Sequence, residues 1–283
     1  MLPEAEIVLG FAVRESNLAA ASKLRWIHVT AAGVEGVLFP ALVESPVVLT
    51  CSRGLHARSM AEHALATMLA FARQLHRSRD AQHERRWSQR EHWEAAPGFA
   101  DLAGSTVAIV GFGAIGRAIG AGCRALGQQV LAVRRRPGGD PAPAHECFGP
   151  ERLGDALERA DWLVLCAPLT PATRGLIGAA QLARLKPGAR LVNVGRGALV
   201  DEPALIEALR SGRVAGAALD VMATEPLPPE SPLWTLPEVI VTPHVSGLGP
   251  RYWERALELF AANLERWLAG EPLLGRVDKA AGY

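Results

Sequence analysis

The sequence predicts an α/β protein of two domains, with a doubly wound parallel sheet in the larger domain and a second, smaller α/β domain beside it. Three observations predict this class. The chain has 283 residues, more than most single hydrophobic cores use. Short β-branched segments alternate with helical patterns from residue 106 to residue 244, which is typical of parallel sheets. A looser alternation of the same kind fills about the first hundred residues.

The segments expected to form the larger sheet are almost entirely apolar, as strands covered on both faces usually are. They lie at residues 106–110, 128–133, 162–167, 191–194, 215–221 and 239–242. Helices are expected from about Ala114, near residues 152–160 and near residues 203–211. We assign residues 74–251 to this domain.

The smaller domain is expected to contain residues 1–73 and 252–283. Its strands should lie at residues 5–12, 26–29 and 46–50, followed by a long helix over residues 57–76. A terminal helix should follow Pro250 and end at Gly270. Its apolar positions recur every three or four residues, at Trp253, Leu257, Phe260, Leu264, Trp267 and Leu268.

Residues 76–100 are polar, contain Trp87 and Trp93, and show no clear period, which indicates an arm or linker.

Composition excludes several kinds of binding partner. The formal net charge of +1 provides no overall field for nucleic acid or an anionic membrane. No apolar run reaches the roughly 18 residues of a membrane span, and no basic, apolar leader opens the chain. We therefore expect a cytoplasmic protein. The four cysteines lack the spacing of metal ligands or a redox pair, so we expect reduced, mostly buried thiols and no metal site.

Three glycines, Gly111, Gly113 and Gly116, directly follow the apolar segment 106–110 and open the next helix. Glycines at this spacing allow a tight turn, close approach of a pyrophosphate and close packing of the helix, whose N-terminus offers free N–H groups. The flanking strands and helix are present, so the motif predicts a Rossmann-type NAD(P) site that includes Ala114 and Ile115. The alternative is a glycine-rich structural turn.

The next strand ends at Val133, and a site for NAD places a carboxylate about 20 residues after the glycines. This chain has Arg134, Arg135 and Arg136 there instead. Guanidinium groups bind phosphate through charge-assisted hydrogen bonds, so these residues favour NADP(H) over NAD(H). The alternative is chance, because arginine is common throughout the chain.

Four later segments, CAPLTPATRGLI, LVNVGRGALVDE, AALDVMATEPLP and VIVTPHVSG, occur in this order after the glycine motif. Over about residues 26 to 268 the chain resembles the D-isomer-specific 2-hydroxyacid dehydrogenases of the glyoxylate and hydroxypyruvate reductase type. The resemblance implies a flavodoxin-like smaller domain, which here looks shortened at its N-terminus, either because the start codon is misassigned or because the domain is reduced. No regulatory domain is expected after the terminal helix, which argues against the multidomain phosphoglycerate dehydrogenases. The resemblance also implies a homodimer, for which the Trp87 and Trp93 arm is the candidate contact.

Reduction of a 2-keto acid needs a cation for the carboxylate and carbonyl, a proton donor and a hydride donor. By resemblance, Arg196 is the substrate arginine, His244 is the proton donor, and Glu225 holds the imidazole and favours its charged form. Arg196 and His244 would contact both substrate and cofactor. Taken singly, a histidine after a strand or a glutamate before a proline is more often structural.

The resemblance also assigns residues outside this triad. Ala32 and Gly33 would bind the substrate carboxylate through backbone N–H groups, unless they form a plain turn. Further cofactor contacts are implied at Met60, Cys166, Pro168, Thr173, Val194, Asp220 and Ser246. Three of these have structural alternatives: core packing for Met60, a turn for Thr173, and a helix cap or strand-end turn for Asp220.

The leading hypothesis is therefore NADPH-dependent reduction of a small 2-keto acid. Oxidation of phosphite on the same scaffold is an alternative, whereas Glu225 argues against formate, because formate-oxidising relatives have an amide at that position. A protein of another class, a non-catalytic dinucleotide sensor like the family's corepressors, is the third possibility.

Overall fold

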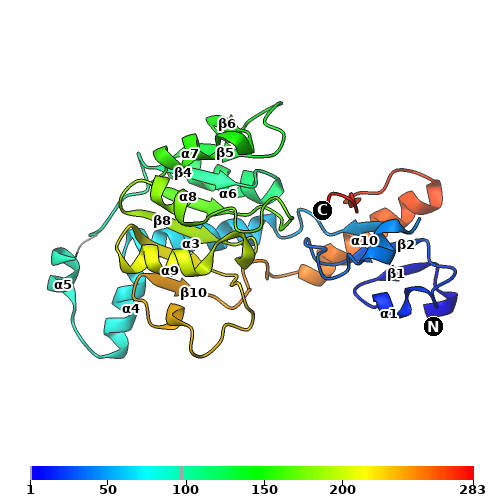
Figure 1. Cartoon of the computed structure of the whole chain (residues 1–283), viewed down its shortest axis with the longest axis horizontal. Helices are drawn as coiled ribbons and strands as arrows, with labels where there is room; N and C mark the ends of the chain where they lie inside the picture. Colours follow the sequence, from blue (N-terminus) through cyan, green and yellow to red (C-terminus); the bar gives the residue numbers. More distant parts are fainter. Residues whose placement is uncertain (1, 96–97) are drawn as a thin grey trace. The chain divides into compact units, whose positions relative to one another are not determined.

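The computed structural model describes residues 2–95 and 98–283. The chain divides into two compact units, one of Met1–His56 with Leu248–Tyr283 and one of Ala57–Gly247. Figure 1 shows each unit with its own sheet. The predicted fold class, a doubly wound parallel sheet with a second, smaller α/β domain, is confirmed.

The larger unit is built on a seven-stranded sheet in the order β10-β9-β8-β7-β4-β5-β6, and every neighbouring pair is parallel. From β4 the chain adds β5 and β6 on one side, then crosses to β7 on the other side of β4. The crossing creates a topological switch point at the carboxyl ends of β4 and β7, where open sheets of this kind bind ligands. The strands are β4 (Thr106–Val110), β5 (Gln129–Val133), β6 (Glu146–Phe148), β7 (Trp162–Leu165), β8 (Ala189–Asn193), β9 (Val214–Leu219) and β10 (Val239–Val241).

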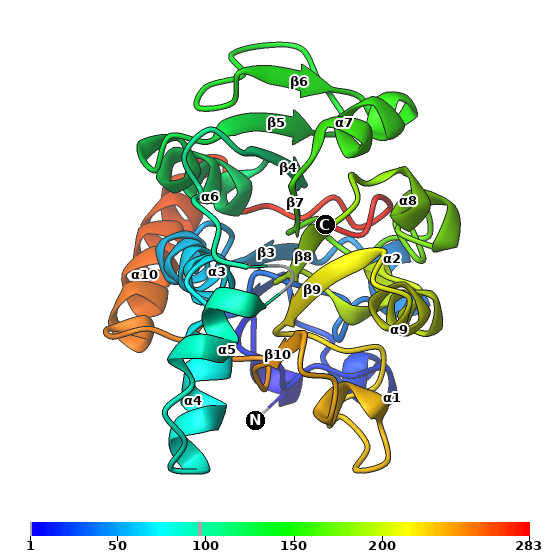
Figure 2. The same ribbon diagram turned by 90° about the vertical axis from the view of Figure 1, so that its left-hand side faces the viewer.

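Helices cover both faces of this sheet, and alternate strand residues point to the two faces. Figure 2 shows α3 and α6 on one face and α7, α8 and α9 on the other. Val107 and Ile109 of β4 belong to the core under α3 and α6, whereas Ala108 and Val110 belong to the opposite core. The helices are α3 (Ala57–Ala72), α6 (Ala114–Ala125), α7 (Leu153–Arg159), α8 (Ala179–Arg184) and α9 (Glu202–Arg210).

The smaller unit has a parallel sheet in the order β1-β2-β3, formed by Ile7–Leu9, Trp26–Val29 and Val48–Cys51. Helices α1 (Glu15–Leu18) and α2 (Pro40–Glu44) join these strands. The terminal helix α10 (Tyr252–Ala269) packs on β2, where the Trp26 ring stacks on Phe260 and Trp267. The segment after α10 then runs along β3, with Val277 N–H bonded to the Leu49 carbonyl.

The boundaries between the two units lie at other residues than those predicted from the sequence. The predicted boundary at residue 73 placed the long helix in the smaller domain, but α3 packs against α6 in the core of the larger unit. The reason is that Met60, Ala64 and Met68 form a buried stripe that faces the larger sheet. At the second crossing the boundary lies at Leu248 rather than residue 252.

The predicted arm contains two helices, α4 (Leu75–His83) and α5 (Gln89–Glu94), which the sequence did not predict. Both are largely polar, which is why no apolar period marked them. The residues at 96 and 97 of this predicted arm lie outside the described part of the chain. The side chains of Trp87 and Trp93 are 88% and 77% exposed.

The apolar face predicted for the terminal helix is only partly correct. Phe260 and Trp267 pack on the sheet, but Trp253, Leu257 and Leu268 are 64%, 50% and 78% exposed. The buried side instead includes Asn263, whose amide binds both the N–H and the carbonyl of Leu274. Asn263 thus turns the chain back toward β3, a role that hydrophobic periodicity does not reveal.

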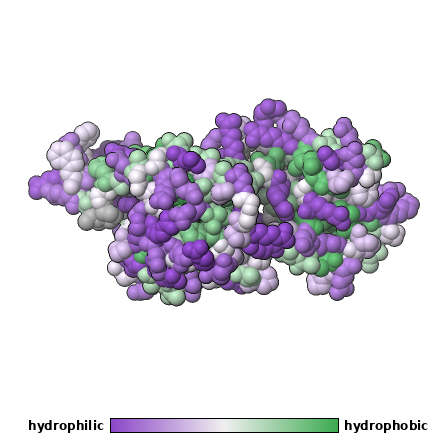
Figure 3. Space-filling view, turned by 90° about the horizontal axis from the view of Figure 1, so that it is seen from above, coloured by the Kyte–Doolittle hydropathy of each residue, from purple (hydrophilic) through white to green (hydrophobic). Residues whose placement is uncertain are grey.

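Within the part of the chain that the structure describes, no helix is long and apolar enough to cross a membrane. Among the same residues, no group of three or more His, Cys, Asp or Glu side chains could hold a metal ion. Hydrophilic residues predominate on the face of the molecule shown in Figure 3, with apolar residues between them.

Candidate active site

The glycine motif forms the loop between β4 and α6, at the switch point of the larger sheet. Gly111 has a φ of +98°, and a Cβ there would come within 2.4 Å of the Ala167 backbone nitrogen. A Cβ on Gly116 would come within 2.3 Å of the Gly111 carbonyl oxygen. A Cβ on Gly113, in contrast, would meet nothing within 4 Å. The first and third glycines therefore pack the loop, and the second leaves open space above it.

That space fits a dinucleotide pyrophosphate. Helix α6 begins at Ala114, with Gly113 as its N-cap residue, so the N–H groups of its first turn, including that of Ile115, have no carbonyl partner within the helix. A helix N-terminus of this kind binds anions through these N–H groups and the helix dipole. The strand, the glycine loop and the helix start predicted from the sequence are therefore present, with free N–H groups at the start of α6.

The loop after β7 closes one side of the glycine loop. The Cys166 thiol donates to the Gly111 carbonyl at 3.0 Å, and burial raises its pKa to about 12. It acts as a packing group rather than a nucleophile. Further along, the Thr173 hydroxyl donates to the Pro168 carbonyl and accepts from the Thr170 N–H, both at 2.8 Å. Thr173 therefore makes the hydrogen bonds of a residue that stabilises a turn, which was the structural alternative to a cofactor contact.

The three arginines follow β5 directly, beside the glycine loop, because the Gly111 N–H donates to the carbonyl of Val133. Arg134 turns back on its own loop and donates to the Gly138 carbonyl at 2.7 Å. Its Nε is buried without a hydrogen-bond partner among the described residues. Arg135 and Arg136 have exposed side chains at the same strand end. A buried donor without a partner, next to two exposed guanidinium groups, fits an anion such as a 2′-phosphate.

Arg196 lies in the loop that follows β8. Asn193 holds this loop at both sides: its amide nitrogen donates to the Arg196 carbonyl at 3.0 Å, and its amide oxygen accepts from the Gly195 N–H at 3.1 Å. A Cβ on Gly197 would come within 1.9 Å of the Met222 backbone. The Arg196 loop is therefore packed directly against the loop that follows β9.

His244 follows β10 and pairs with Glu225, which lies in the loop after β9. His244 Nδ1 is 2.7 Å from Glu225 Oε2, while Glu225 Oε1 accepts from the Met222 N–H at 3.0 Å. The side chains of His244 and Glu225 are 49% and 35% exposed. His244 has a φ of +54°, a conformation that side-chain-bearing residues adopt mostly where the surroundings impose it. The imidazole is thus held at one nitrogen and is accessible from solvent.

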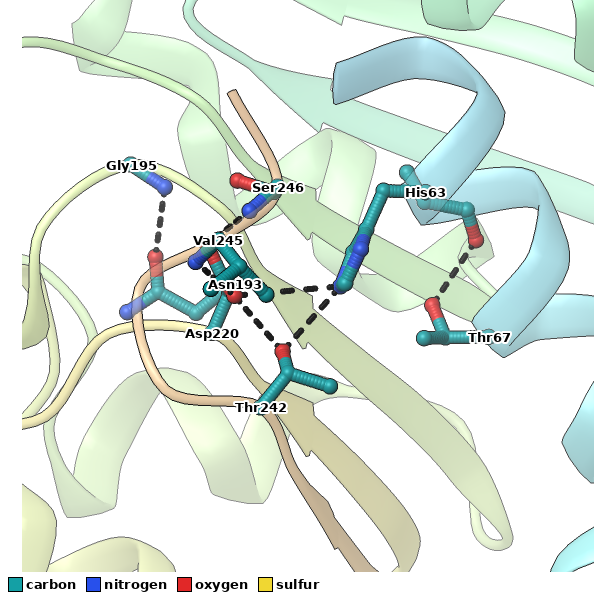
Figure 4. A network of polar contacts seen from close by, with 9 residues as sticks. His63, Thr67, Asn193, Gly195, Asp220, Thr242, Val245 and Ser246 are labelled. Carbon is teal, nitrogen blue, oxygen red and sulfur yellow. Dashed lines mark hydrogen bonds and ion pairs between the residues drawn. The ribbon is translucent and has the colours of Figure 1, made fainter. Parts of the chain in front are cut away.

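Asp220, at the end of β9, is buried beneath this loop. Its Oδ1 accepts from the Thr242 hydroxyl at 2.6 Å and from the Val245 N–H at 2.9 Å, and its Oδ2 accepts from the Ser246 N–H at 2.9 Å (Figure 4). Burial alone would raise the pKa of this carboxyl, but the hydrogen bonds outweigh it and lower the pKa below its usual value. Asp220 is therefore an ionised carboxylate with no exposed surface.

The network around Asp220 contains a residue that the sequence analysis did not identify. His63 of α3 places its Nε2 3.1 Å from the Thr242 hydroxyl and 3.9 Å from Asp220 Oδ1 (Figure 4). His63 is one of several histidines in the chain, and it sits on a helix that follows no motif. No local signal distinguishes it, because its partner Thr242 lies 179 residues further along the chain.

The structure brings together at one sheet edge the residues predicted for catalysis and most of those predicted for the cofactor. The loops after β8, β9 and β10 carry Arg196 with Val194, Asp220 with Glu225, and His244 with Ser246. Met60 of α3 is 9% exposed and belongs to the hydrophobic core beneath α6, in agreement with its core-packing alternative.

The predicted substrate loop belongs to the smaller unit. Ala32 and Gly33 follow β2, and the preceding Ala31 carbonyl accepts from the Ser52 N–H at 3.0 Å. The Tyr252 hydroxyl donates to the Thr30 carbonyl at 3.0 Å. These bonds fix the start of the loop within its own unit.

A parallel sheet with a pyrophosphate cradle at its switch point defines a dinucleotide-binding protein. The family model described as D-isomer specific 2-hydroxyacid dehydrogenase, NAD binding domain, matches residues 65–246. This chain therefore belongs to the D-isomer specific 2-hydroxyacid dehydrogenase family, and the resemblance inferred from its motifs is confirmed.

Two curated relatives show the range of the family. The D-3-phosphoglycerate dehydrogenase of Mycobacterium leprae is 39% identical over 280 residues, which cover 95% of this chain and 50% of the relative. The glyoxylate reductase of Korarchaeum cryptofilum is 34% identical over 254 residues, which cover 89% of this chain and 75% of the relative. The chain thus spans about half the length of the phosphoglycerate dehydrogenase.

Solved structures agree with the fold. A D-isomer specific 2-hydroxyacid dehydrogenase from Xanthobacter autotrophicus, in complex with NADPH and MES, matches with a TM-score of 0.85 and 34% identity over 100% of this chain and 87% of the other. The NADPH-dependent glyoxylate/hydroxypyruvate reductase of Sinorhizobium meliloti, with NADP and sulfate, matches with a TM-score of 0.86 and 30% identity over 99% and 87%.

Proposed function

We propose that this protein reduces a small 2-keto acid, of the size of glyoxylate or hydroxypyruvate, to the D-2-hydroxy acid with NADPH. The observation that carries the proposal is the pairing of His244 Nδ1 with Glu225 Oε2 at 2.7 Å, at the sheet edge that also bears the glycine cradle. A histidine held at one nitrogen by a carboxylate is equipped to give up a proton from the other nitrogen.

When bound at the glycine loop, NADPH would supply the hydride that reduces the carbonyl carbon of the substrate. His244 donates the Nε2 proton to the carbonyl oxygen, and the ring becomes neutral. Glu225 stabilises the charged ring before this transfer and fixes its orientation. Arg196 binds the substrate carboxylate and polarises the carbonyl, because a fixed guanidinium favours the charge that develops on oxygen. The products are the hydroxy acid and the oxidised cofactor.

Substitution of Arg196 tests the substrate role. We expect Arg196→Ala to reduce kcat/KM more than about 100-fold, because a buried substrate carboxylate would lose its charged partner. Arg196→Lys is the matched control, which keeps the charge but loses the forked geometry and should retain part of the activity. Near-native kcat/KM in Arg196→Ala would refute this role.

The choice of NADP(H) is supported by the arginines at the end of β5 and by the buried Nε of Arg134 that lacks a partner among the described residues. Two solved relatives are described with NADPH or NADP. We expect kcat/KM to be at least tenfold higher with NADPH than with NADH. Comparable values in a steady-state assay would contradict the proposal.

Oxidation of 3-phosphoglycerate is a second candidate, favoured by the 39% identity to a phosphoglycerate dehydrogenase. A panel of glyoxylate, hydroxypyruvate, pyruvate and a bulkier 2-keto acid with NADPH, and of 3-phosphoglycerate and phosphite with the oxidised cofactors, separates these activities. Dinucleotide binding without turnover of any of them would favour the sensor alternative.

We also propose that the protein is a cytoplasmic homodimer. The exposed Trp87 and Trp93 of the α4–α5 arm support a contact with a second copy, and the four free cysteines are compatible with a reducing compartment. Sedimentation that shows only monomers at micromolar concentration would exclude the dimer.

A further inference from the structure

The hydrogen bonds of Asp220 converge on the segment that carries His244. The carboxylate accepts from Thr242, Val245 and Ser246, and the Asp220 carbonyl accepts from the His244 N–H at 2.8 Å. The residues on both sides of His244 are thus fixed to one buried side chain. Because His244 has a φ of +54°, its backbone needs such constraints to remain in place.

The position of the protons in this network can be deduced from its donors and acceptors. Asp220 is ionised, so the short contact of 2.6 Å uses the only hydroxyl proton of Thr242. The Thr242 oxygen must then accept in its contact with His63, and His63 must donate from Nε2. The chain of donation therefore runs from His63 through Thr242 to Asp220.

His63 is well placed to act in this way. It lies on α3, a helix of 16 residues whose buried side packs in the core of the larger unit, and its side chain is 20% exposed. Figure 4 shows the ring directed toward Thr242 and Asp220 from the helix opposite the loops. Within the described residues, the hydrogen bonds and ion pair of Asp220 involve one side chain that can carry positive charge, that of His63.

We propose that His63 is a positioning residue of the active site, which directs the Thr242 hydroxyl onto Asp220 and so holds the 242–246 segment with His244 aligned on Glu225. The proposal rests on the proposed function in one respect, namely that His244 is the proton donor. It adds a residue on a distant helix to the machinery of proton transfer. It involves no contact between His63 and the substrate.

The first test needs no substrate. Nitrogen-15 NMR of the free protein, at a pH where histidines are neutral, reports which ring nitrogen of His63 bears the proton. We expect the Nε2–H tautomer in the wild type and a loss of this preference in Thr242→Val. The Nδ1–H tautomer in the wild type would overturn the proposal, whether or not the protein reduces 2-keto acids.

The second test uses variants of His63. His63→Leu removes the donor, and His63→Gln retains an N–H group of similar reach. We expect kcat to fall about tenfold in His63→Leu and less than about threefold in His63→Gln, with little change in the Kd for NADPH. The His244 ring signals should shift in His63→Leu. Equal losses in both variants, or unchanged kcat in His63→Leu, would overturn the role of the donated hydrogen bond.

Thr67→Val is the matched control for helix stability. Thr67 lies one turn further along α3 (Figure 4), is buried, and its hydroxyl donates to the Ala64 carbonyl of the same helix. It should lower Tm slightly and leave both kcat and the His244 signals unchanged. If Thr67→Val lowers kcat as much as His63→Leu does, the effect belongs to the helix and the proposal fails. If the wild type reduces no 2-keto acid, the proposed function fails, and the tautomer measurement still decides the role of His63.

Discussion

Each unit of the protein buries a titratable side chain in a hydrogen-bond network, and the two networks connect to different parts of the chain. In the smaller unit, His28 of β2 places Nδ1 2.7 Å from the Thr50 hydroxyl and Nε2 3.2 Å from the Ser52 hydroxyl. Trp26 also donates to Thr50, at 2.8 Å. This network begins and ends within two adjacent strands and the residue that follows them.

The network of Asp220 extends further. It connects a helix, the ends of two strands and the loop that carries His244. His28 is neutral, since burial lowers its pKa to about 4, whereas Asp220 is charged because its donors outweigh burial. The role of a buried polar group therefore depends on which parts of the chain its hydrogen bonds connect. The hydrogen bonds of His28 stay within the core of the smaller unit, whereas the hydrogen bonds of Asp220 reach the segment that carries His244, the proposed proton donor.

The largest effect is expected when the longer network is broken at its centre. Asp220→Asn replaces one acceptor oxygen with an NH2 group that faces N–H donors, so the 242–246 segment loses its anchor. We expect kcat to fall about 100-fold and the free energy of unfolding to fall by about 1–3 kcal/mol. Steady-state kinetics and urea unfolding measure the two. A loss of stability with unchanged kcat would show that Asp220 is structural, as His28 is taken to be.

Much of this organisation could be predicted from the sequence. Strand, glycine loop and helix follow one another locally, so the cradle at Gly111, Gly113 and Gly116 required no knowledge of tertiary structure. The pairing of Glu225 with His244 was implied by family resemblance and is seen at 2.7 Å. Both features combine short sequence motifs with an established topology.

The remaining features depend on contacts that no local pattern encodes. The link from His63 to Thr242 joins residues 179 positions apart, and Asn263 is a polar residue on the buried side of α10. The helices of the arm were missed because a polar helix has no apolar period, and β6 because it has only three residues at the sheet edge. Tertiary packing decides all four cases.

The two networks should contribute to the free energy of unfolding in different pH ranges. The folded-state pKa of His28 is lowered from 6.5 to about 4, so the unfolded chain binds a proton at a higher pH than the folded chain does. Stability from neutral His28 is therefore complete above pH 6.5 and is lost as the pH falls toward 4. At about 1.4 kcal/mol per pH unit, this loss amounts to about 3 kcal/mol.

Asp220 acts in a different pH range. Its folded pKa lies below the usual 3.8, so its contribution is present above that value and is lost only at lower pH. Urea unfolding from pH 7 to pH 4, followed by far-ultraviolet circular dichroism, should show a steeper loss of the free energy of unfolding in the wild type than in His28→Gln. Identical slopes in the two proteins would mean that folding does not lower the pKa of His28.

The smallest effect is expected when the closed network loses one hydroxyl group. Thr50→Val keeps the shape of the side chain but removes the partner of both Trp26 Nε1 and His28 Nδ1. Since buried polar groups without a partner are costly, we expect a loss of about 1–3 kcal/mol in the free energy of unfolding. Ser52→Ala, which removes the weaker contact of 3.2 Å, should cost less, about 1 kcal/mol. Neither variant should change kcat, because the network of His28 does not reach the 242–246 segment. A reduced kcat in Thr50→Val at a temperature where the protein is fully folded would contradict the distinction between the two networks.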